Sequence, residues 1–257
     1  ITDSLLYAKR IQESLLPSNQ TFTSLLKDSF ILYKPKDIVS GDFYWINEVD
    51  DKLFVAVVDC TGHGVPGAFM SIIGVELLDN ITNKQGITEP DKILYDLNMG
   101  ISKTLSKDNN QNKSIRDGMD IALCVIDKNK GEMEFSGAFR PIYLLRDNKI
   151  EEIKGDRFSV GMLEHSMGEK PISKQTLSLR EDDMIYLFTD GYADQFGGPE
   201  GKKYKYRRFR HLLLTIHKLP LEQQKRYLNQ SIEDWQGDQE QIDDILIVGF
   251  SPKGFSA

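Results

Sequence analysis

The sequence predicts an α+β fold in which two packed, mainly antiparallel β-sheets are flanked by helices. Short apolar runs typical of strands recur along the 257 residues, and turn pairs such as Asp50-Asp51 and Asp147-Asn148 separate them. Helical patterns are gathered between the strand runs and do not alternate with single strands. No internal repeat, low-complexity tract or linker divides the chain, so we expect one main domain.

Hydrophobic periodicity and turn signals place the individual elements. Strands are expected at 29–36, 42–48, 52–59, 119–127, 131–136, 141–146, 149–153, 174–179, 184–189 and 243–250. Helices are expected at 65–82, 90–106, 205–217 and 221–235. The polar stretch 108–117 is expected to be a mobile loop, and Gly155 to Lys170 to be irregular.

The first residues of the chain predict an amphipathic helix at 1–16, because apolar residues recur there at three- and four-residue steps. Pro17 ends this helix. It either packs on its own domain or is the end of a longer coupling helix that pairs with another subunit, and the pattern favours neither. We therefore divide the chain into a coupling or dimerisation helix, 1–18, and a domain, 19–257.

Composition excludes some classes of protein. The net charge of −7 argues against a nucleic-acid partner, because such proteins usually carry a basic balance. Two cysteines, Cys60 and Cys124, lie in apolar strand contexts and indicate a reducing, cytoplasmic compartment. No uninterrupted apolar run approaches the roughly 20 residues of a membrane span, so we expect no transmembrane helix in this chain. Because the chain starts at Ile1, we expect it to be a piece of a longer protein, in which any membrane segment lies upstream.

Carboxylates stand at the ends of apolar strand-like runs in four places. They are Asp42 in SGDFYW, Asp59 ending VAVVD, Asp190 ending MIYLFTD, and Asp243 with Asp244 at the start of DDILIVGF. Burying an unpaired charge is costly, and several such acids together would repel one another. A divalent cation relieves both effects, and oxygen ligands without a nearby His or Cys pair suit Mg²⁺ or Mn²⁺. The alternative is that each acid merely caps a strand or turn, but the repeated pattern favours a metal site.

A Gly-His-Gly turn follows Asp59, and Pro66 then begins a helix rich in small and apolar residues. His63 within that turn is a candidate general acid, although shaping the loop is the favoured role. Asp117 begins an expected turn ahead of a core strand. Whether Asp120, the next acid along, reaches the metals is left open.

Four motifs resemble the metal-dependent PPM-type (type-2C-like) serine/threonine phosphatases, and more narrowly the SpoIIE/RsbU branch of bacterial regulatory phosphatases. In chain order they are SGDFYW, VVDCTGHGVPGAFMS, LFTDGYADQ and IDDILIV. The segment YAKRIQESLLP also resembles the helix that links a sensor to the catalytic domain in that branch. Each motif is weak alone, but four in order make a specific resemblance that covers the chain from Tyr7 to Phe250.

The resemblance implies an αββα sandwich with two Mn²⁺ or Mg²⁺ ions at one end of the sheets. Asp59 would bridge both ions. Asp42 and the backbone carbonyl of Cys60 would hold one ion, and Asp190 and Asp243 would hold the other. The implied reaction is hydrolysis of a phosphoester by a metal-activated water.

Two features depart from the wider type-2C pattern. Ala138 in GAFRP stands where eukaryotic enzymes have an acid for a third metal, so no third site is assigned there. The arginine that contacts substrate phosphate in those enzymes has no clear match. Lys34 and Lys36 lie near the right place, but solvated lysines are the favoured interpretation.

The function implied is that of a protein serine/threonine phosphatase, the output domain of a bacterial signalling protein with an upstream sensor. Its substrate would be a phosphoprotein such as a STAS-type anti-sigma-factor antagonist, which rests on family analogy. The alternatives are a degenerate phosphatase-like binding module and a small-molecule phosphohydrolase. The basic cluster Lys202 to Arg210 is either a solvated helix start or a contact for an acidic partner.

Overall fold

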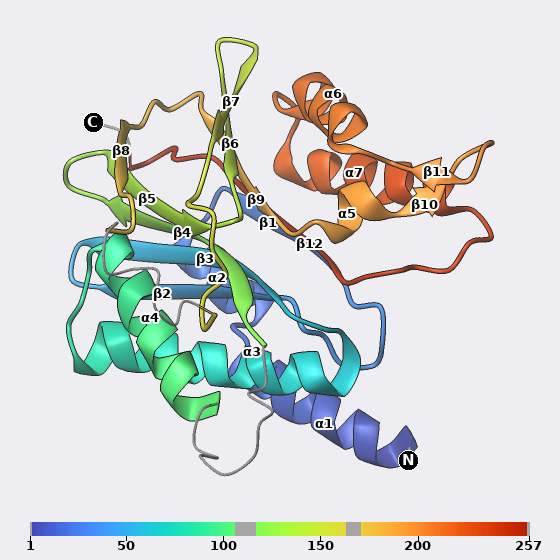
Figure 1. Ribbon diagram of the computed structural model, residues 1–257. Coiled ribbons are helices and arrows are strands. Elements are labelled where there is room, and N and C mark those ends of the chain that lie inside the picture. Colours follow the sequence, from blue (N-terminus) through green and yellow to red (C-terminus); the bar gives the residue numbers. More distant parts are fainter. Residues whose placement is uncertain (1, 106–116, 163–170, 256–257) are drawn as a thin grey trace.

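The computed structural model describes residues 2–105, 117–162 and 171–255, and it forms a four-layered αββα sandwich (Figure 1). Two expected segments lie wholly or partly outside these ranges. They are the loop 108–117, of which only residue 117 is described, and the irregular segment 155–170, which is described as far as residue 162. Two five-stranded sheets lie face to face, and helices cover the outer face of each. The predicted fold class is therefore confirmed.

Both sheets are antiparallel throughout. One has the order β1-β12-β9-β6-β7, and the other β2-β3-β4-β5-β8. The strands of the first are β1 (Ser29–Lys34), β12 (Ile245–Phe250), β9 (Met184–Phe188), β6 (Ile142–Arg146) and β7 (Lys149–Ile153). The strands of the second are β2 (Phe43–Val49), β3 (Lys52–Cys60), β4 (Met119–Asp127), β5 (Glu132–Ala138) and β8 (Gln175–Ser178).

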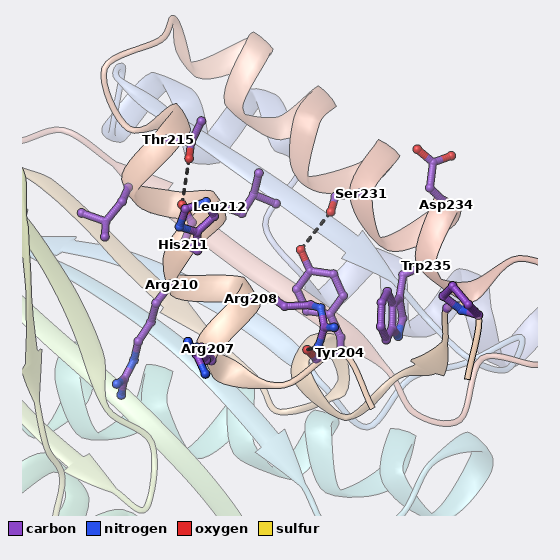
Figure 2. A pocket seen from close by; sticks show the side chains of 13 residues that line it. Tyr204, Arg207, Arg208, Arg210, His211, Leu212, Thr215, Ser231, Asp234 and Trp235 are labelled. Atoms are coloured by element: carbon purple, nitrogen blue, oxygen red, sulfur yellow. Dashed lines mark hydrogen bonds between the residues drawn. The ribbon is translucent and has the colours of Figure 1, made fainter. Parts of the chain in front are cut away.

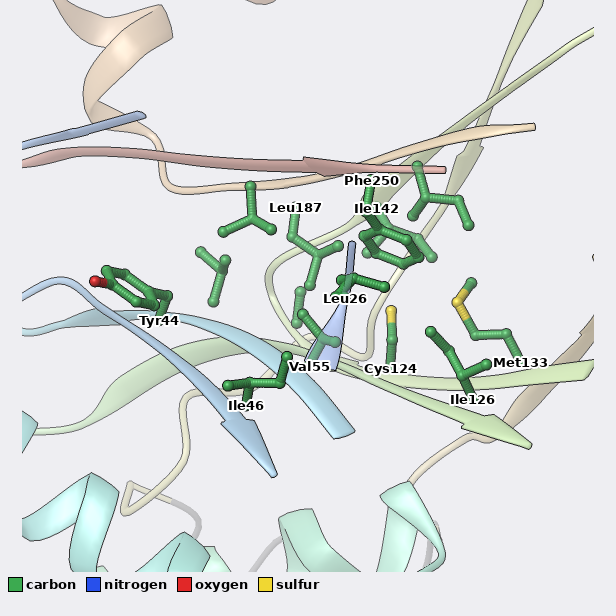
Figure 3. Packing of buried hydrophobic residues seen from close by; sticks show 14 of the residues in the cluster. Leu26, Tyr44, Ile46, Val55, Cys124, Ile126, Met133, Ile142, Leu187 and Phe250 are labelled. Atoms are coloured by element: carbon green, nitrogen blue, oxygen red, sulfur yellow. The ribbon is translucent and has the colours of Figure 1, made fainter. Parts of the chain in front are cut away.

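The central core lies between the two sheets. Val55 and Cys124 from one sheet meet Leu187 and Phe250 from the other in a fully buried cluster (Figure 3). Because side chains alternate along a strand, Phe54 on β3 points to the opposite face, into a second cluster beneath the helices. Both faces of β3 are thus buried, which explains why its sequence is a continuous apolar run.

Helices α3 (Gly64–Asp79) and α4 (Pro90–Leu105) cover the β2–β8 sheet, while α6 (Tyr206–Ile216) and α7 (Leu221–Gln236) cover the other (Figure 1). The apolar side chains that these helices turn toward the sheets supply the two outer cores. Each of the four matches an expected helix to within a few residues. A π-helical turn, Asn80–Lys84, continues α3.

By length and composition alone, the 21-residue stretch Gly64–Lys84 could cross a membrane, which the sequence analysis did not anticipate. The helix instead buries Met70, Val75 and Leu78 against the β2–β8 sheet. This packing accounts for its apolar composition.

Three short elements were not predicted. They are α2 (Asn19–Leu25), α5 (Gly191–Asp194) and the hairpin of β10 (Phe196–Gly197) with β11 (Lys202–Lys203). Short helices are marginal by themselves and are formed mainly by packing, so the sequence carries little signal for them.

Helix α1 (Thr2–Leu15) lies against α3 (Figure 1). Its one buried residue is Gln12, which is 5% exposed. The Gln12 side chain donates to the Ser40 carbonyl (2.6 Å) and the Ser71 hydroxyl (2.9 Å), and accepts from the Ser40 N–H (3.1 Å). The helix is thereby bonded to the loop that leads into Asp42.

Candidate metal centre

The acid-bearing strand ends meet at one edge of the sandwich. In the β2–β8 sheet, the start of β2 pairs with the end of β3, since Phe43 lies opposite Val58. In the other sheet, the start of β12 lies beside the end of β9, where Ile247 is opposite Phe188. Antiparallel pairing therefore brings the acids of each sheet to the same edge.

Strand alternation also determines the direction of these side chains. Alternate residues of a strand point to the same face of the sheet, so Asp59 points the same way as Val55 and Val57, which face the other sheet. For the same reason Asp42 points the same way as Tyr44, which also faces the other sheet. Both carboxylates therefore point toward the space between the sheets and toward the acids of the second sheet.

Electrostatic coupling among the acids is strong. Burial, and then repulsion from Asp190, raise the pKa of Asp59 well above its usual range. Burial, and then repulsion from Asp59, raise the pKa of Asp42 in the same manner. The pKa of Asp243 is raised by burial, although the Asp244 N–H opposes the shift. Acids from four separate segments thus act on one another at this edge.

Close glycine contacts hold these segments together. A Cβ added at Gly41 would lie 2.5 Å from the Gly62 carbonyl oxygen, and one at Gly67 would lie equally close to it. The Asp42 loop, the Gly-His-Gly turn and the start of α3 can approach this closely only without side chains. In the other sheet, a Cβ at Gly191 would lie 1.9 Å from the Asp244 carbonyl oxygen.

The two adjacent acids Asp243 and Asp244 have different surroundings. Asp244 is 1% exposed, and its carboxylate accepts the N–H groups of Gly41 (2.8 Å) and Lys36 (2.8 Å). Asp244 therefore ties the β1–β2 loop to the opposite sheet. Asp243 is half-buried, and its Oδ1 accepts the Asp244 N–H at 2.8 Å. This difference leaves Asp243 as the better candidate ligand.

The residues at this edge fit a divalent cation by charge and donor type. Asp42 Oδ2 is buried and has no hydrogen-bond partner, an arrangement that is costly unless a cation meets the oxygen. Within the described ranges, no three His, Cys, Asp or Glu side chains are close enough to form a ready-made metal cluster. Like-charged carboxylates repel, so their close approach requires a cation. The assignment of Asp42, Asp59, Asp190 and Asp243 as ligands stays a prediction.

The other predicted positions are also located. Gly41 faces the Cys60 carbonyl oxygen, which a Cβ there would approach to 3.5 Å, so that carbonyl lies beside the Asp42 loop. Asp120 is directly opposite Asp59 in the β3–β4 ladder and accepts a hydrogen bond from Ser159. Asp120 is thus a further acid at the same edge.

His63 lies in the turn after β3 and is about half exposed. Its Nδ1 is 2.7 Å from Asp37 Oδ2, and its Nε2 is 3.1 Å from Lys36 Nζ. These contacts orient the ring and join the turn to the β1–β2 loop, in agreement with the loop-shaping role. Lys34 instead points to α7, where it contacts Asn229 and Glu233.

Arg140 is the residue that the sequence analysis missed. It lies in the turn between β5 and β6, and its Nε and Nη1 are buried without a hydrogen-bond partner. Burial alone would lower the pKa of its guanidinium. The neighbouring Tyr206, Asp59 and Asp190 outweigh that effect and raise the pKa. The arginine is visible in the sequence GAFRP, but no local pattern distinguishes it from a solvated arginine in a turn.

A two-sheet sandwich with acids gathered at one edge defines the class of PPM-type, or type-2C-like, phosphatase domains. The sequence profile of the family described as Stage II sporulation protein E (SpoIIE) matches residues 49–252, and the chain belongs to this family. No curated protein matches the sequence.

Solved structures agree with this class. The SiaA-PP2C domain of Pseudomonas aeruginosa is 33% identical, with a TM-score of 0.86 over 97% of this chain and 96% of that one. The phosphatase domain of SpoIIE from Bacillus subtilis, solved with a fragment of its regulatory domain, is 20% identical, with a TM-score of 0.67 over 86% of this chain and 62% of that one. RsbX in complex with magnesium is 13% identical, with a TM-score of 0.57 over 86% and 92%. The last two show likeness of fold alone.

Proposed function

We propose that this chain is a metal-dependent protein serine/threonine phosphatase, acting as the cytoplasmic output domain of a signalling protein with an upstream sensor. The observation that carries the proposal is the convergence of strand-end acids from four segments at one edge of the sandwich, beside a buried oxygen of Asp42 that has no partner. Two further findings support it: the chain belongs to a phosphatase family, and RsbX, which has a similar fold, was solved in complex with magnesium.

Each side chain has a proposed part in the reaction. Two Mn²⁺ or Mg²⁺ ions would be held by four carboxylates and one backbone carbonyl, those of Asp42, Asp59, Asp190, Asp243 and Cys60 respectively. These ions would supply Lewis-acid charge to the phosphoryl group and lower the pKa of a water nucleophile. Arg140 would donate its two unpartnered N–H groups to phosphate oxygens, a geometry for which a planar guanidinium is suited.

Hydrolysis assays test this proposal. We expect Mn²⁺ or Mg²⁺ to support hydrolysis of p-nitrophenyl phosphate and a phosphoserine peptide, and EDTA to abolish it. Asp190→Asn should remove the activity. Asp194→Asn, four residues further on in α5 and half exposed, is the matched control and should retain it. Equal activity of Asp190→Asn and wild type would refute the site assignment.

The same assays separate the alternatives. Failure to bind metal in calorimetry, together with no hydrolysis of any phosphoester, would indicate a degenerate binding module. Metal binding without hydrolysis would indicate a switched-off enzyme. Hydrolysis of nucleotides or sugar phosphates but not of phosphopeptides would indicate a small-molecule phosphohydrolase. A phosphorylated STAS-type antagonist is the proposed natural substrate class, and hydrolysis of a phosphopeptide derived from such a protein would support it.

Homodimerisation through α1 is proposed from an apolar stripe on the exposed side of the helix. Tyr7, Ile11 and Leu15, spaced by four residues, are 66%, 42% and 43% exposed. Such a face suits a second copy of the helix. Ile11→Glu should shift sedimentation toward the monomer, and deletion of residues 1–16 should also change turnover. Unchanged sedimentation in both variants would exclude this role.

A further inference from the structure

We propose that the groove between α6 and α7 is a docking surface for an acidic segment of the phosphoprotein substrate. This inference rests on the proposed phosphatase function and extends it from the reacting phosphate to the surrounding polypeptide. The groove has a volume of about 1190 Å³, and side chains from both helices and from the β10–β11 hairpin line it (Figure 2).

Uncompensated positive charge is the first observation. The stretch from Lys202 to His211 contains no acid, in a chain whose net charge is −7. Acids outside the stretch pair with three of its cations, Lys202, Lys203 and Arg210. Arg207 and Arg208 line the groove and are exposed, and neither forms an ion pair within the described ranges. Asp234 is the single acid in the lining, and Gln230 donates to it at 2.7 Å. The groove therefore attracts acidic groups.

A rigid aromatic wall is the second observation. The Arg208 guanidinium lies 4.5 Å from the centre of the Trp235 ring (Figure 2). Tyr204 packs edge-on against that ring at 5.5 Å and bonds to the Ser231 hydroxyl at 2.9 Å. The Trp235 indole N–H is shared between the carbonyls of Gln195 and Lys202. A pre-ordered surface of this kind loses little side-chain entropy when a peptide binds.

The third observation is that the groove lies next to the edge of the sandwich that carries the candidate metal centre. Lys205 donates its N–H to the Ala193 carbonyl at 2.7 Å, which joins the start of α6 to α5. Tyr206, the next residue, lies beside Arg140 and Asp190. The basic segment therefore begins at the candidate metal centre, and a substrate whose phosphate reaches Arg140 would place neighbouring residues along α6.

Paired phosphoserine peptides with acidic and neutral flanks test the proposal. Arg207→Ala/Arg208→Ala should lower kcat/KM for the acidic peptide by about three- to tenfold, mainly through KM, since exposed ion pairs are individually weak. Hydrolysis of p-nitrophenyl phosphate and of the neutral peptide should be unchanged. The preference of the wild type for the acidic peptide should also fall as salt rises.

Lys225→Ala/Arg226→Ala is the matched control, because these two cations lie on α7 and do not line the groove. An equal loss in both double variants would mean that net charge alone acts, and would overturn the proposal. The proposal would also be overturned if the ratio of kcat/KM for the acidic peptide to kcat/KM for the neutral peptide were the same in the Arg207/Arg208 variant as in the wild type.

Binding separates failure of the groove from failure of the phosphatase proposal. If the wild type hydrolyses nothing, the phosphatase proposal fails, and fluorescence anisotropy of a labelled acidic peptide still tests the groove. Weaker binding in the Arg207/Arg208 variant than in the control variant would support docking. Equal binding, or displacement of the peptide by single-stranded RNA at lower concentrations than by unlabelled peptide, would overturn it.

Discussion

Replacing Gln12 by alanine should disconnect α1 from the candidate metal centre. The substitution removes three hydrogen bonds, two of them to the backbone of Ser40, which is fully buried. Each buried group left without a partner costs about 1–3 kcal/mol, so two such groups correspond to about 2–6 kcal/mol. The cost cannot exceed the free energy with which α1 docks, because the helix can detach and expose Ser40 to water.

Thermal unfolding and metal calorimetry measure the two consequences. For a chain of this size, a loss of 1 kcal/mol lowers Tm by roughly 2–4 °C, so a fall of several degrees is expected if α1 stays docked. Because Ser40 is two residues from Asp42, affinity for Mn²⁺ should also fall. If the helix detaches instead, hydrogen exchange in α1 should rise sharply while the Tm of the sandwich changes little.

Arg10→Ala is the matched control, since Arg10 is exposed on the same helix. Its Tm, exchange and metal affinity should match those of the wild type. If Gln12→Ala were indistinguishable from this control in all three measurements, the proposed connection between α1 and the centre would be refuted.

Three further predictions follow from the site. Arg140→Met should lower kcat/KM for a phosphopeptide about 10- to 100-fold without weakening Mn²⁺ binding in calorimetry, since a hydrogen bond to a charged group contributes about 1.5–3 kcal/mol; weaker Mn²⁺ binding would indicate a structural role. Gly191→Ala should lower stability by about 1–3 kcal/mol in denaturant titrations, because its Cβ would lie 1.9 Å from the Asp244 carbonyl oxygen; an unchanged midpoint would contradict that packing. The folded state raises the pKa of Asp42, so the stability this group contributes is fully present below its ordinary pKa of 3.8 and is lost as pH rises through the raised value. In EDTA at neutral pH, Asp42→Asn should therefore unfold at a higher temperature than the wild type, and the difference should close toward pH 3.8; a variant less stable at neutral pH would reverse this sign.

Much of the fold was predictable because its signals are local. The apolar run of β3 and the amphipathic patterns of α4 and α7 each identify an element without knowledge of its partners. The four acids were predicted as candidate ligands for a similar reason, since an acid directly before or after an apolar strand conflicts with burial. The boundary between residues 18 and 19 is not tested by the fold and stays a prediction.

Residues that act through distant neighbours were not predictable. Gln12 lies on the same predicted stripe of the amphipathic helix as Ile11 and Leu15, and only docking shows that Gln12 is buried while the two apolar residues are exposed. Arg140 became a site residue only because the β5–β6 turn meets the ends of β3 and β9.

The sequence by itself determined which segments form strands and helices, and which oxygens are candidates to bind cations, because periodicity and the cost of burying charge act within a few residues. The tertiary structure decided which of those groups meet. Asp244 became an anchor through contacts with a loop some 200 residues earlier in the chain, as the 203-residue separation between Gly41 and Asp244 shows. This left Asp243 as the better candidate ligand of the two. Such contacts form only when two sheets pack face to face, and no local pattern specifies them.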